Sequence, residues 1–162
     1  MKERLVMKTM ELDRGRSAPA LPEDLRQTAG TCALVEMTLE AAQAVGGQLP
    51  RWSGVAEGPF NPRMLLTMLT YCYAAGIYGS EEIEWATGDN PAVRYLCANA
   101  YPDWKTIRRF RNANRPWIEE CLAWVYGLAC GVKAGEEGDA NLARFAREKV
   151  KFSVLMDTAM AE

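Results

Sequence analysis

The sequence predicts an all-α protein, a compact helical bundle that contains a helix-turn-helix-like trio of short helices. Two observations carry this prediction. Apolar residues recur at helical spacing in several segments, and no run of useful length alternates apolar and polar residues as a half-buried strand does. The chain has 162 residues, 49% of them hydrophobic. It is therefore long enough to bury one sizeable core and too short for two full-sized domains.

Three parts are expected along the chain. Residues 1–31 mix glycines and prolines with charged residues and show little periodicity, which predicts a loosely ordered N-terminal arm. Residues 32–131 hold most of the helical patterns and are expected to form the main helical domain. Residues 132–162 are expected to form a C-terminal helix after a glycine-rich break, GVKAGEEG.

The first two helices of the main domain follow from their start and stop signals. Thr31 opens a segment with apolar residues at helical spacing, and Gly46 and Gly47 end it. After a loop rich in glycine and proline, Asn61 and Pro62 mark the next start, because asparagine caps a helix and proline suits its first turn. The helix that follows, RMLLTMLTYCYAAGI, is apolar around most of its circumference and should be the central core helix.

Three short helices are expected next, separated by sharp breaks. Ser80, Asn90 and Asp103 each stand at a helix start, where their side chains can accept a hydrogen bond from the first turn. The three helices are expected over residues 80–87, 91–98 and 103–114. Arg115 and Pro116 begin a longer helix, PWIEECLAWVYGLAC, which completes the main domain.

The residue types exclude several kinds of chemistry. The chain has no histidine, which removes the commonest general base, Cys/His zinc sites and Ser-His or Cys-His nucleophilic pairs. Its five cysteines are widely spaced among apolar residues without a CxxC pair, as in the core of a protein from a reducing compartment. The five tryptophans are expected to pack in the core rather than to form a ligand cage. No metal, cofactor or catalytic residue is assigned.

The chain is expected to be cytoplasmic and to have no membrane partner. Its first residues are mixed in charge and lack the apolar region of a signal peptide. No later window approaches roughly 18 uninterrupted apolar residues, the length that a membrane-spanning helix needs.

Residues 102–115 carry five basic side chains and one acid in a chain whose formal net charge is -2. With about 100° of rotation per residue, Trp104, Ile107 and Phe110 form an apolar stripe that faces the core. Another side of this helix is almost purely cationic and carries Lys105, Arg108, Arg109 and Asn112. Lysine offers a mobile charge, arginine a planar fork for phosphate or guanine, and asparagine a reader of adenine. With Arg115, these residues are the predicted contacts to double-stranded DNA. The alternative is an ordinary solvated helix face.

Arg111 needs a separate explanation, because the helical wheel places it between Trp104 and Ile107 on the inner stripe. A buried guanidinium needs an acidic partner. The nearest acids in sequence lie in the segment SEEIEWA, so Arg111 is predicted to pair with Glu81, Glu82 or Glu84. Glu84 is assigned as its partner in a structural ion pair.

Read together, residues 60–111 resemble the N-terminal domain of InsH-type insertion-sequence transposases. The resemblance rests on four short motifs that follow one another in the same order. Their matching residues here are Pro62, Leu65 and Leu66; Gly76, Ile77, Ser80, Ile83 and Glu84; Arg94, Tyr95 and Leu96; and Pro102, Asp103, Thr106, Ile107, Phe110 and Arg111. In that family the helical domain precedes a DDE catalytic domain of RNase-H-like fold. The resemblance therefore implies a role in recognising transposon ends.

The chain departs from the family after the helix PWIEECLAWVYGLAC. The family continues with a strand that carries the first catalytic aspartate, usually followed by glycine and threonine. Here Asp139 and Asp157 lie in helix-like surroundings, so neither receives a catalytic role and the chain is expected not to act as an enzyme by itself.

Three hypotheses about function remain. The first is a DNA-binding module that recognises transposon ends and lacks its own catalytic site, working beside a separately encoded transposase. The second is a protein-interaction or inhibitory module, in which the final helix pairs with a second copy or with a full-length transposase. Its pairing residues would be Leu142, Phe145, Phe152, Leu155 and Met156. The third is a decayed transposase fragment.

Overall fold

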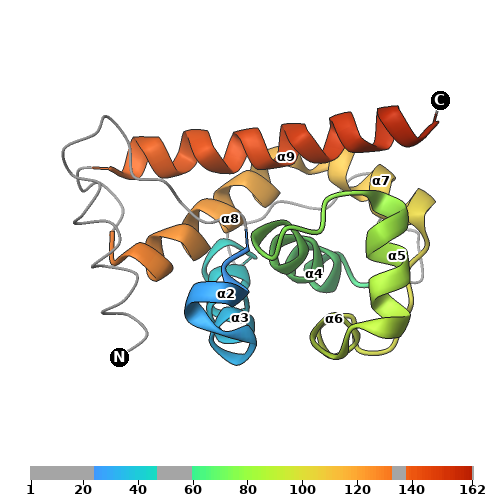
Figure 1. The fold of residues 1–162 in the computed structure, drawn as a ribbon, viewed down its shortest axis with the longest axis horizontal. Helices are drawn as coiled ribbons and strands as arrows, with labels where there is room; N and C mark the ends of the chain where they lie inside the picture. The colour runs from blue at the N-terminus through green and yellow to red at the C-terminus, as the bar shows by residue number, and fades with distance from the viewer. Residues whose placement is uncertain (1–23, 47–59, 133–137, 162) are drawn as a thin grey trace.

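The computed structural model describes residues 24–46, 60–132 and 138–161, and these ranges contain helices and no strand (Figure 1). The all-α prediction is therefore confirmed. The helices are α2 (Arg26–Ala29), α3 (Thr31–Gly46), α4 (Pro62–Ala74), α5 (Ser80–Asp89), α6 (Pro91–Leu96), α7 (Trp104–Ala113), α8 (Arg115–Cys130) and α9 (Asp139–Ala161). Most of the expected N-terminal arm lies outside the described residues. The part of it that is described includes Leu25, which is fully buried.

Three of the predicted helix starts have the capping bonds that their sequences suggest. Asn61, Asn90 and Asp103 each accept a hydrogen bond from a backbone N–H in the first turn of α4, α6 and α7, at 2.8, 3.0 and 2.9 Å. Ser80 is different. The residue at the cap position of α5 is Gly79, which makes no side-chain bond, and the Ser80 hydroxyl is bonded to Asp157 instead. The prediction that Ser80 caps its helix was wrong because a distant carboxylate takes its hydroxyl.

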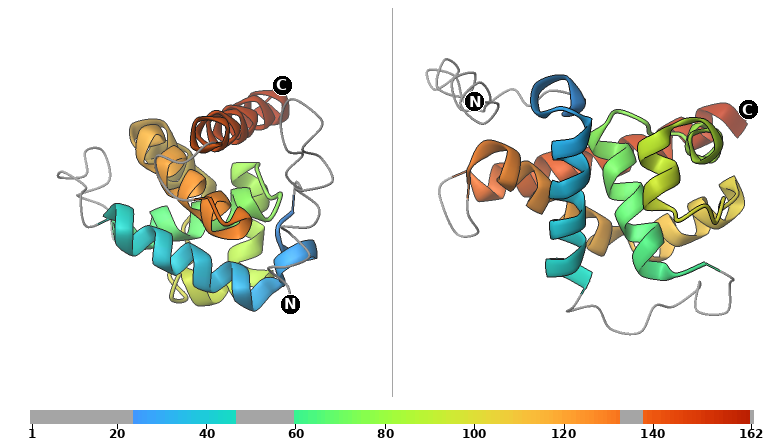
Figure 2. Two further views of the ribbon diagram at one scale, coloured as in Figure 1. Left: turned by 90° about the vertical axis from the view of Figure 1, so that its left-hand side faces the viewer. Right: turned by 90° about the horizontal axis from the view of Figure 1, so that it is seen from below.

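Helix α4 is the central core helix, as its sequence predicts. Every residue from 65 to 74 is buried, because α4 packs against α3, α6, α7, α8 and α9. The left view in Figure 2 shows α9 along one side of the bundle and α3 on the other, with α4 between them. α8 packs on α3, α4 and α9 and so joins the two sides. It ends at Gly131, whose φ of 70° is left-handed and favours glycine.

The three short helices α5, α6 and α7 lie together at the right-hand end in Figure 1, where α5 packs against both of the others. Their ends lie within about two residues of the predicted bounds, which is the usual uncertainty of helix ends. The segment between α6 and α7 turns sharply. Ala98, Asn99 and Tyr101 all have positive φ, between 50° and 58°.

Helix α9 packs along α8 and contributes to the same core. Its buried positions are Leu142, Ala146, Val150, Ser153 and Asp157, and this spacing of four, four, three and four residues keeps them on one face. Two of the five are polar. The bonds that satisfy those two polar side chains connect α9 to the short helices.

Some predictions about single residues were wrong. Trp85 is 77% exposed on α5 and Trp124 is also exposed, so not all tryptophans pack in the core. Four cysteines are buried as expected, but Cys32 is exposed. Among the described residues, no helix is long and apolar enough to cross a membrane.

Candidate nucleic-acid interface

The structure places the predicted cationic residues of α7 at different depths. Lys105, Arg109 and Asn112 are exposed, and Arg108 is half-buried. Ile107 and Phe110 are fully buried on the opposite side of the helix. Arg115, in the first turn of α8, is also half-buried. α7 is therefore amphipathic with a cationic outer side, while Arg108 lies at the boundary between that side and the interior.

Trp104 lies under two of these cations. Its ring is half-buried, and the Lys105 ammonium and the Arg108 guanidinium lie 5.6 and 4.7 Å from the ring centre. Both contacts are within the range of cation–π attraction. They hold the two charges near the start of α7 and restrict their movement.

Two carboxylates hold the first turn of α7. Asp103 accepts from the backbone N–H of Thr106, and Glu84 on α5 accepts from that of Trp104 at 2.9 Å. Hydrogen bonds from the Thr106 side chain and backbone lower the pKa of Asp103, so it is ionised at neutral pH. The backbone N–H groups of Trp104 and Thr106 are therefore already bonded, which leaves the side chains of α7 as its main candidates for phosphate contacts.

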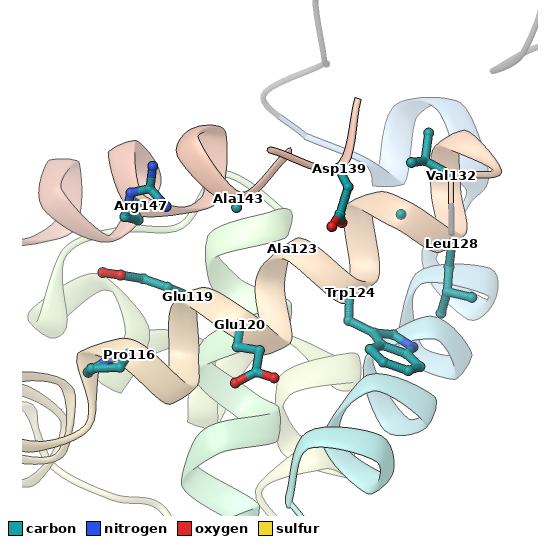
Figure 3. A pocket seen from close by; sticks show the side chains of 11 residues that line it. Pro116, Glu119, Glu120, Ala123, Trp124, Leu128, Val132, Asp139, Ala143 and Arg147 are labelled. Atoms are coloured by element: carbon teal, nitrogen blue, oxygen red, sulfur yellow. The ribbon is translucent and has the colours of Figure 1, made fainter. Parts of the chain in front are cut away.

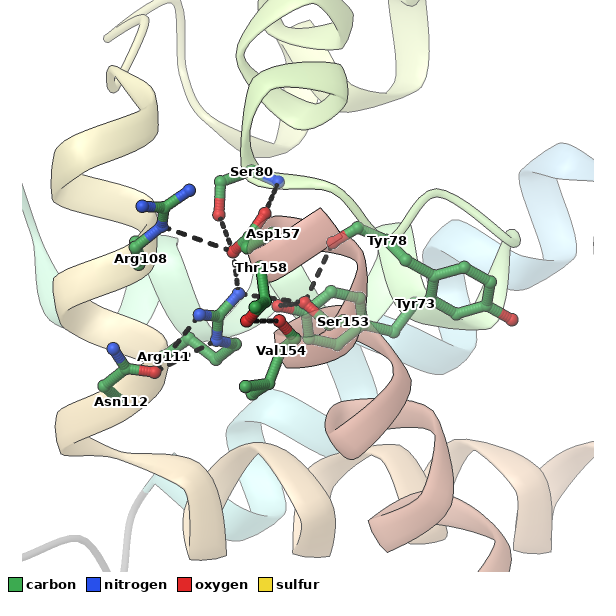
Figure 4. Close-up of polar contacts among 10 residues, drawn as sticks. All are labelled: Tyr73, Tyr78, Ser80, Arg108, Arg111, Asn112, Ser153, Val154, Asp157 and Thr158. Carbon is green, nitrogen blue, oxygen red and sulfur yellow. Dashed lines mark hydrogen bonds and ion pairs between the residues drawn. The ribbon is translucent and has the colours of Figure 1, made fainter. Parts of the chain in front are cut away.

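Arg111 is only 1% exposed, in agreement with its position on the helical wheel, but its acidic partner is not Glu84. The guanidinium donates through Nη1 to Asp157 Oδ2 on α9, and it also bonds to Ser153 Oγ at 3.1 Å (Figure 4). Glu84 lies at the first turn of α7. Arg111 comes seven residues after Trp104, which Glu84 contacts, and this corresponds to about 10 Å along the helix axis. The predicted ion pair with Glu84 was therefore wrong.

Asp157 receives most of the buried polar contacts. Its Oδ1 accepts from the Ser80 backbone N–H at 2.8 Å, and its Oδ2 accepts from the Ser80 hydroxyl at 2.6 Å as well as from Arg111. Arg108 Nε also lies 3.5 Å from Oδ2. Burial raises the pKa of Asp157, but the bonds from Ser80 and the bond and charge of Arg111 outweigh it, so the net shift is downward. This carboxylate is ionised at neutral pH.

Ser153 extends the network into the core. Its hydroxyl is bonded to the Tyr73 hydroxyl at 2.9 Å and to the Tyr78 carbonyl oxygen at 2.8 Å. Burial raises the pKa of Tyr73 to about 12, so its hydroxyl stays neutral. The buried polar network therefore joins α4, the loop before α5, α5, α7 and α9.

Asn112 also takes part in holding Arg111. Its Oδ1 accepts from Arg111 Nε and Nη2, both at 3.2 Å. The usual contact of asparagine with adenine uses the amide oxygen and the amide nitrogen together. With its oxygen engaged by Arg111, Asn112 retains its amide N–H groups for a contact to DNA.

A hollow of about 550 Å³ lies between α8 and α9 (Figure 3). Its lining includes Ala123, Trp124, Leu128, Glu119, Glu120, Asp139, Ala143 and Arg147. Acids outnumber cations in this lining, so the hollow does not suit a phosphate backbone. No group of three or more His, Cys, Asp or Glu residues in the described part of the chain could hold a metal ion.

Comparison with known proteins gives a family match. A family model described as "Transposase domain (DUF772)" matches residues 33–113, half of the chain, from the first turns of α3 to the end of α7. The search of curated proteins and the search of solved structures gave no match. The matched span contains Ser80, Glu84 and the α7 residues from Lys105 to Asn112, whereas Arg115 and Asp157 lie beyond it.

Proposed function

The chain belongs to the DUF772 transposase domain family, and from this premise we propose that it is a DNA-binding module that recognises transposon-end DNA through α7. The observation that carries the proposal is the cationic outer side of this helix. Lys105 and Arg109 are exposed there, while Ile107 on the other side is fully buried. Phosphate contacts from such side chains supply most of the affinity of proteins for duplex DNA.

The cationic side is local, which favours a specific docking orientation. The whole chain has a formal net charge of -2, so it does not attract DNA through its overall field. Exposed charges interact over about one Debye length, roughly 8 Å at physiological salt. A local cationic surface such as that of α7 can therefore attract DNA although the chain as a whole carries a net negative charge.

The anchoring of α7 supports recognition in addition to attraction. Its start is bonded to Glu84 and Asp103, and its end is held by Arg111 and by Asn114, whose side-chain amide donates to the Phe110 carbonyl at 3.1 Å. A helix that reads bases must present its side chains in a fixed register.

The proposed module contributes DNA recognition, and the described residues offer no candidate catalytic site. Two observations support this. The match covers a transposase domain that, in the resembling family, precedes the catalytic domain. Both Asp139 and Asp157 lie on α9, and Asp157 is taken up by Ser80 and Arg111.

Salt-dependent binding to transposon-end duplexes tests the proposal. If Lys105, Arg109 and one further cation each neutralise a phosphate, log K should fall with log salt with a slope of about -2 to -3. Lys105→Ala and Arg109→Ala should each reduce the magnitude of this slope by about one. Arg63→Ala removes an exposed cation outside α7 and serves as the control. A flat salt dependence, or no complex at low salt, contradicts the proposal.

A second candidate function is protein interaction through α9. Phe152 and Leu155 are 45% and 56% exposed on this helix, which favours a partner for them. Leu142 is buried in the chain's own core, so it does not contribute to such a face. Sedimentation of the wild type and of a Phe152→Ser, Leu155→Ser variant tests this function. This function is favoured if the wild type forms a concentration-dependent dimer that added DNA does not change, and if the variant forms no such dimer.

A further inference from the structure

Arg108 is the one cation of α7 that, within the described part of the chain, contacts both an acidic side chain outside α7 and an aromatic ring. Its Nε lies 3.5 Å from Asp157 Oδ2, and its guanidinium carbon lies 4.7 Å from the centre of the Trp104 ring. The Nε atom is buried without a hydrogen bond to any described residue, so the charge of Asp157 is what compensates it. The plane of the guanidinium is thereby restrained.

The residue that holds Nε is itself fixed. Asp157 accepts two bonds from Ser80 and one from Arg111 in the buried network. Asp157 therefore has its hydrogen bonds without Arg108, and it is expected to keep its position when Arg108 contacts DNA. Asp157 acts as a rigid support behind Arg108.

The outer edge of the guanidinium is available. Figure 4 shows both terminal nitrogens of Arg108 pointing away from Asp157, and the side chain is 31% exposed. Within the described ranges, neither terminal nitrogen makes a hydrogen bond. Asn112, by contrast, has its amide oxygen bonded to Arg111. Unlike Asn112, the predicted base reader on this helix, Arg108 keeps both of its terminal nitrogens as outward donors.

We propose that Arg108 is the specificity-determining residue of α7, that its terminal nitrogens donate to the N7 and O6 atoms of a guanine, and that Asp157 and Trp104 position it. This inference rests on the proposed DNA-binding function. A guanidinium with a fixed plane loses little freedom on binding and suits two coplanar acceptors. The exposed Lys105 and Arg109 are suited to the less directional phosphates.

The first test needs a preferred sequence, which is obtained by selecting duplexes from random DNA with the wild-type chain. A selected duplex should contain a guanine whose replacement by 7-deazaguanine, which lacks N7, weakens wild-type binding roughly tenfold. Arg108→Lys keeps the charge but loses the fork. It should weaken binding to the selected duplex by a similar factor and remove the effect of 7-deazaguanine. Its affinity for a scrambled duplex should stay within about twofold of the wild-type value.

The second test separates positioning from contact. Asp157→Asn should reduce the preference for the selected over the scrambled duplex, and Arg108→Lys should then cause little further loss, because the two residues act together. Asp157→Asn can also weaken the fold, so its binding is compared only under conditions where circular dichroism shows the variant folded. The Arg108→Lys measurement does not depend on that variant.

The outcomes distinguish this inference from the function on which it rests. Full preference for the selected duplex in Arg108→Lys, or a 7-deazaguanine effect that persists in that variant, overturns the inference. So does a selection that recovers no sequence although the chain binds DNA with the expected salt slope. Absence of any DNA binding overturns the proposed function instead.

Discussion

At the scale of single residues, Arg111 and Asp157 form the pair whose loss should cost most. Both are buried, and each is the other's ionic partner. Arg111→Ala leaves Asp157 with the two bonds from Ser80 and with Arg108, whose Nε lies 3.5 Å from Oδ2, so its charge loses its closest cation. Breaking a buried pair in this way should lower the free energy of unfolding by about 3 kcal/mol.

Denaturant unfolding of three chains checks this prediction. The matched control is Arg109→Ala, which removes an exposed arginine from the same helix and should change stability by about 0.5 kcal/mol or less. Equal effects of the two substitutions would mean that the buried pair contributes no stability.

The lowered pKa of Asp157 makes part of the stability depend on acid pH. A carboxylate whose pKa in the folded state is below its unfolded value of about 3.9 stabilises the fold fully above that value. This contribution is lost as the pH falls through the folded pKa. The difference in unfolding free energy between the wild type and Asp157→Asn should therefore shrink as the pH is lowered from about 5.

The comparison isolates Asp157, because Asp103, whose pKa is also lowered, is present in both chains. Urea unfolding at several pH values between about 3 and 6 measures the difference. A difference that stays constant over this range shows that the ionised form of Asp157 does not stabilise the fold.

The sequence predicts one member of this pair and misses the other, for a physical reason. The helical wheel places Arg111 inside because burial on one helix is a local property. Its partner is 46 residues further along, and only the packing of α9 brings it near. A signal was nonetheless present. Leu142, Ala146 and Val150 define a buried face, and extending it by helical spacing reaches Asp157.

At the scale of elements, side-chain bonds from α5 and α9 add to the packing that positions α7. Glu84 on α5 bonds to its first turn, and Asp157 on α9 bonds to Arg111 near its end. α5 and α7 lie in the matched transposase span, whereas α9 lies outside it. The candidate interface therefore depends on a helix that the family match does not include.

The bond from Glu84 to Trp104 gives a prediction about the start of α7. Glu84→Ala removes this cap and should cost about 1 kcal/mol, with faster amide hydrogen exchange at Trp104. Glu84→Gln keeps an acceptor oxygen and should retain most of the protection. Glu81→Ala removes an exposed acid from the same helix and is the control. Unchanged exchange at Trp104 in Glu84→Ala would show that Asp103 alone holds this turn.

The helices themselves are largely predictable from the sequence because their caps are local. The side chains of Asn61, Asn90 and Asp103 accept hydrogen bonds from backbone N–H groups no more than three residues away. Ser80 fails as a predicted cap because its partner comes from α9. Local signals thus predict where the helices start, and long-range pairing decides which polar side chains are free for other roles.

At the scale of the whole molecule, one hydrophobic core includes residues of α3, α4, α5, α6, α7, α8 and α9. Leu142, Ala146 and Val150 bring α9 into it, and the buried polar network adds bonds from α9 to α5 and α7. The glycine-rich break before α9 and the apolar face of α9 are visible in the sequence, but which helices that face packs against is decided by packing that no local pattern reveals. We expect α9 to unfold together with the rest of the bundle.

Val150→Ala tests this cooperativity. Val150 is fully buried on α9, and removing two methyl groups from a core position should lower the free energy of unfolding by about 2 kcal/mol. Tryptophan fluorescence reports on α5, α7 and α8, which carry Trp85, Trp104, Trp117 and Trp124, while circular dichroism reports on all helices. If α9 belongs to the cooperative unit, both signals should shift to lower denaturant by the same amount and still coincide.

Leu155→Ala, at an exposed position of α9, should leave both transitions in place. An early loss of helical signal with an unchanged fluorescence transition would mean that α9 unfolds independently, and α7 would then have to keep its position without Asp157.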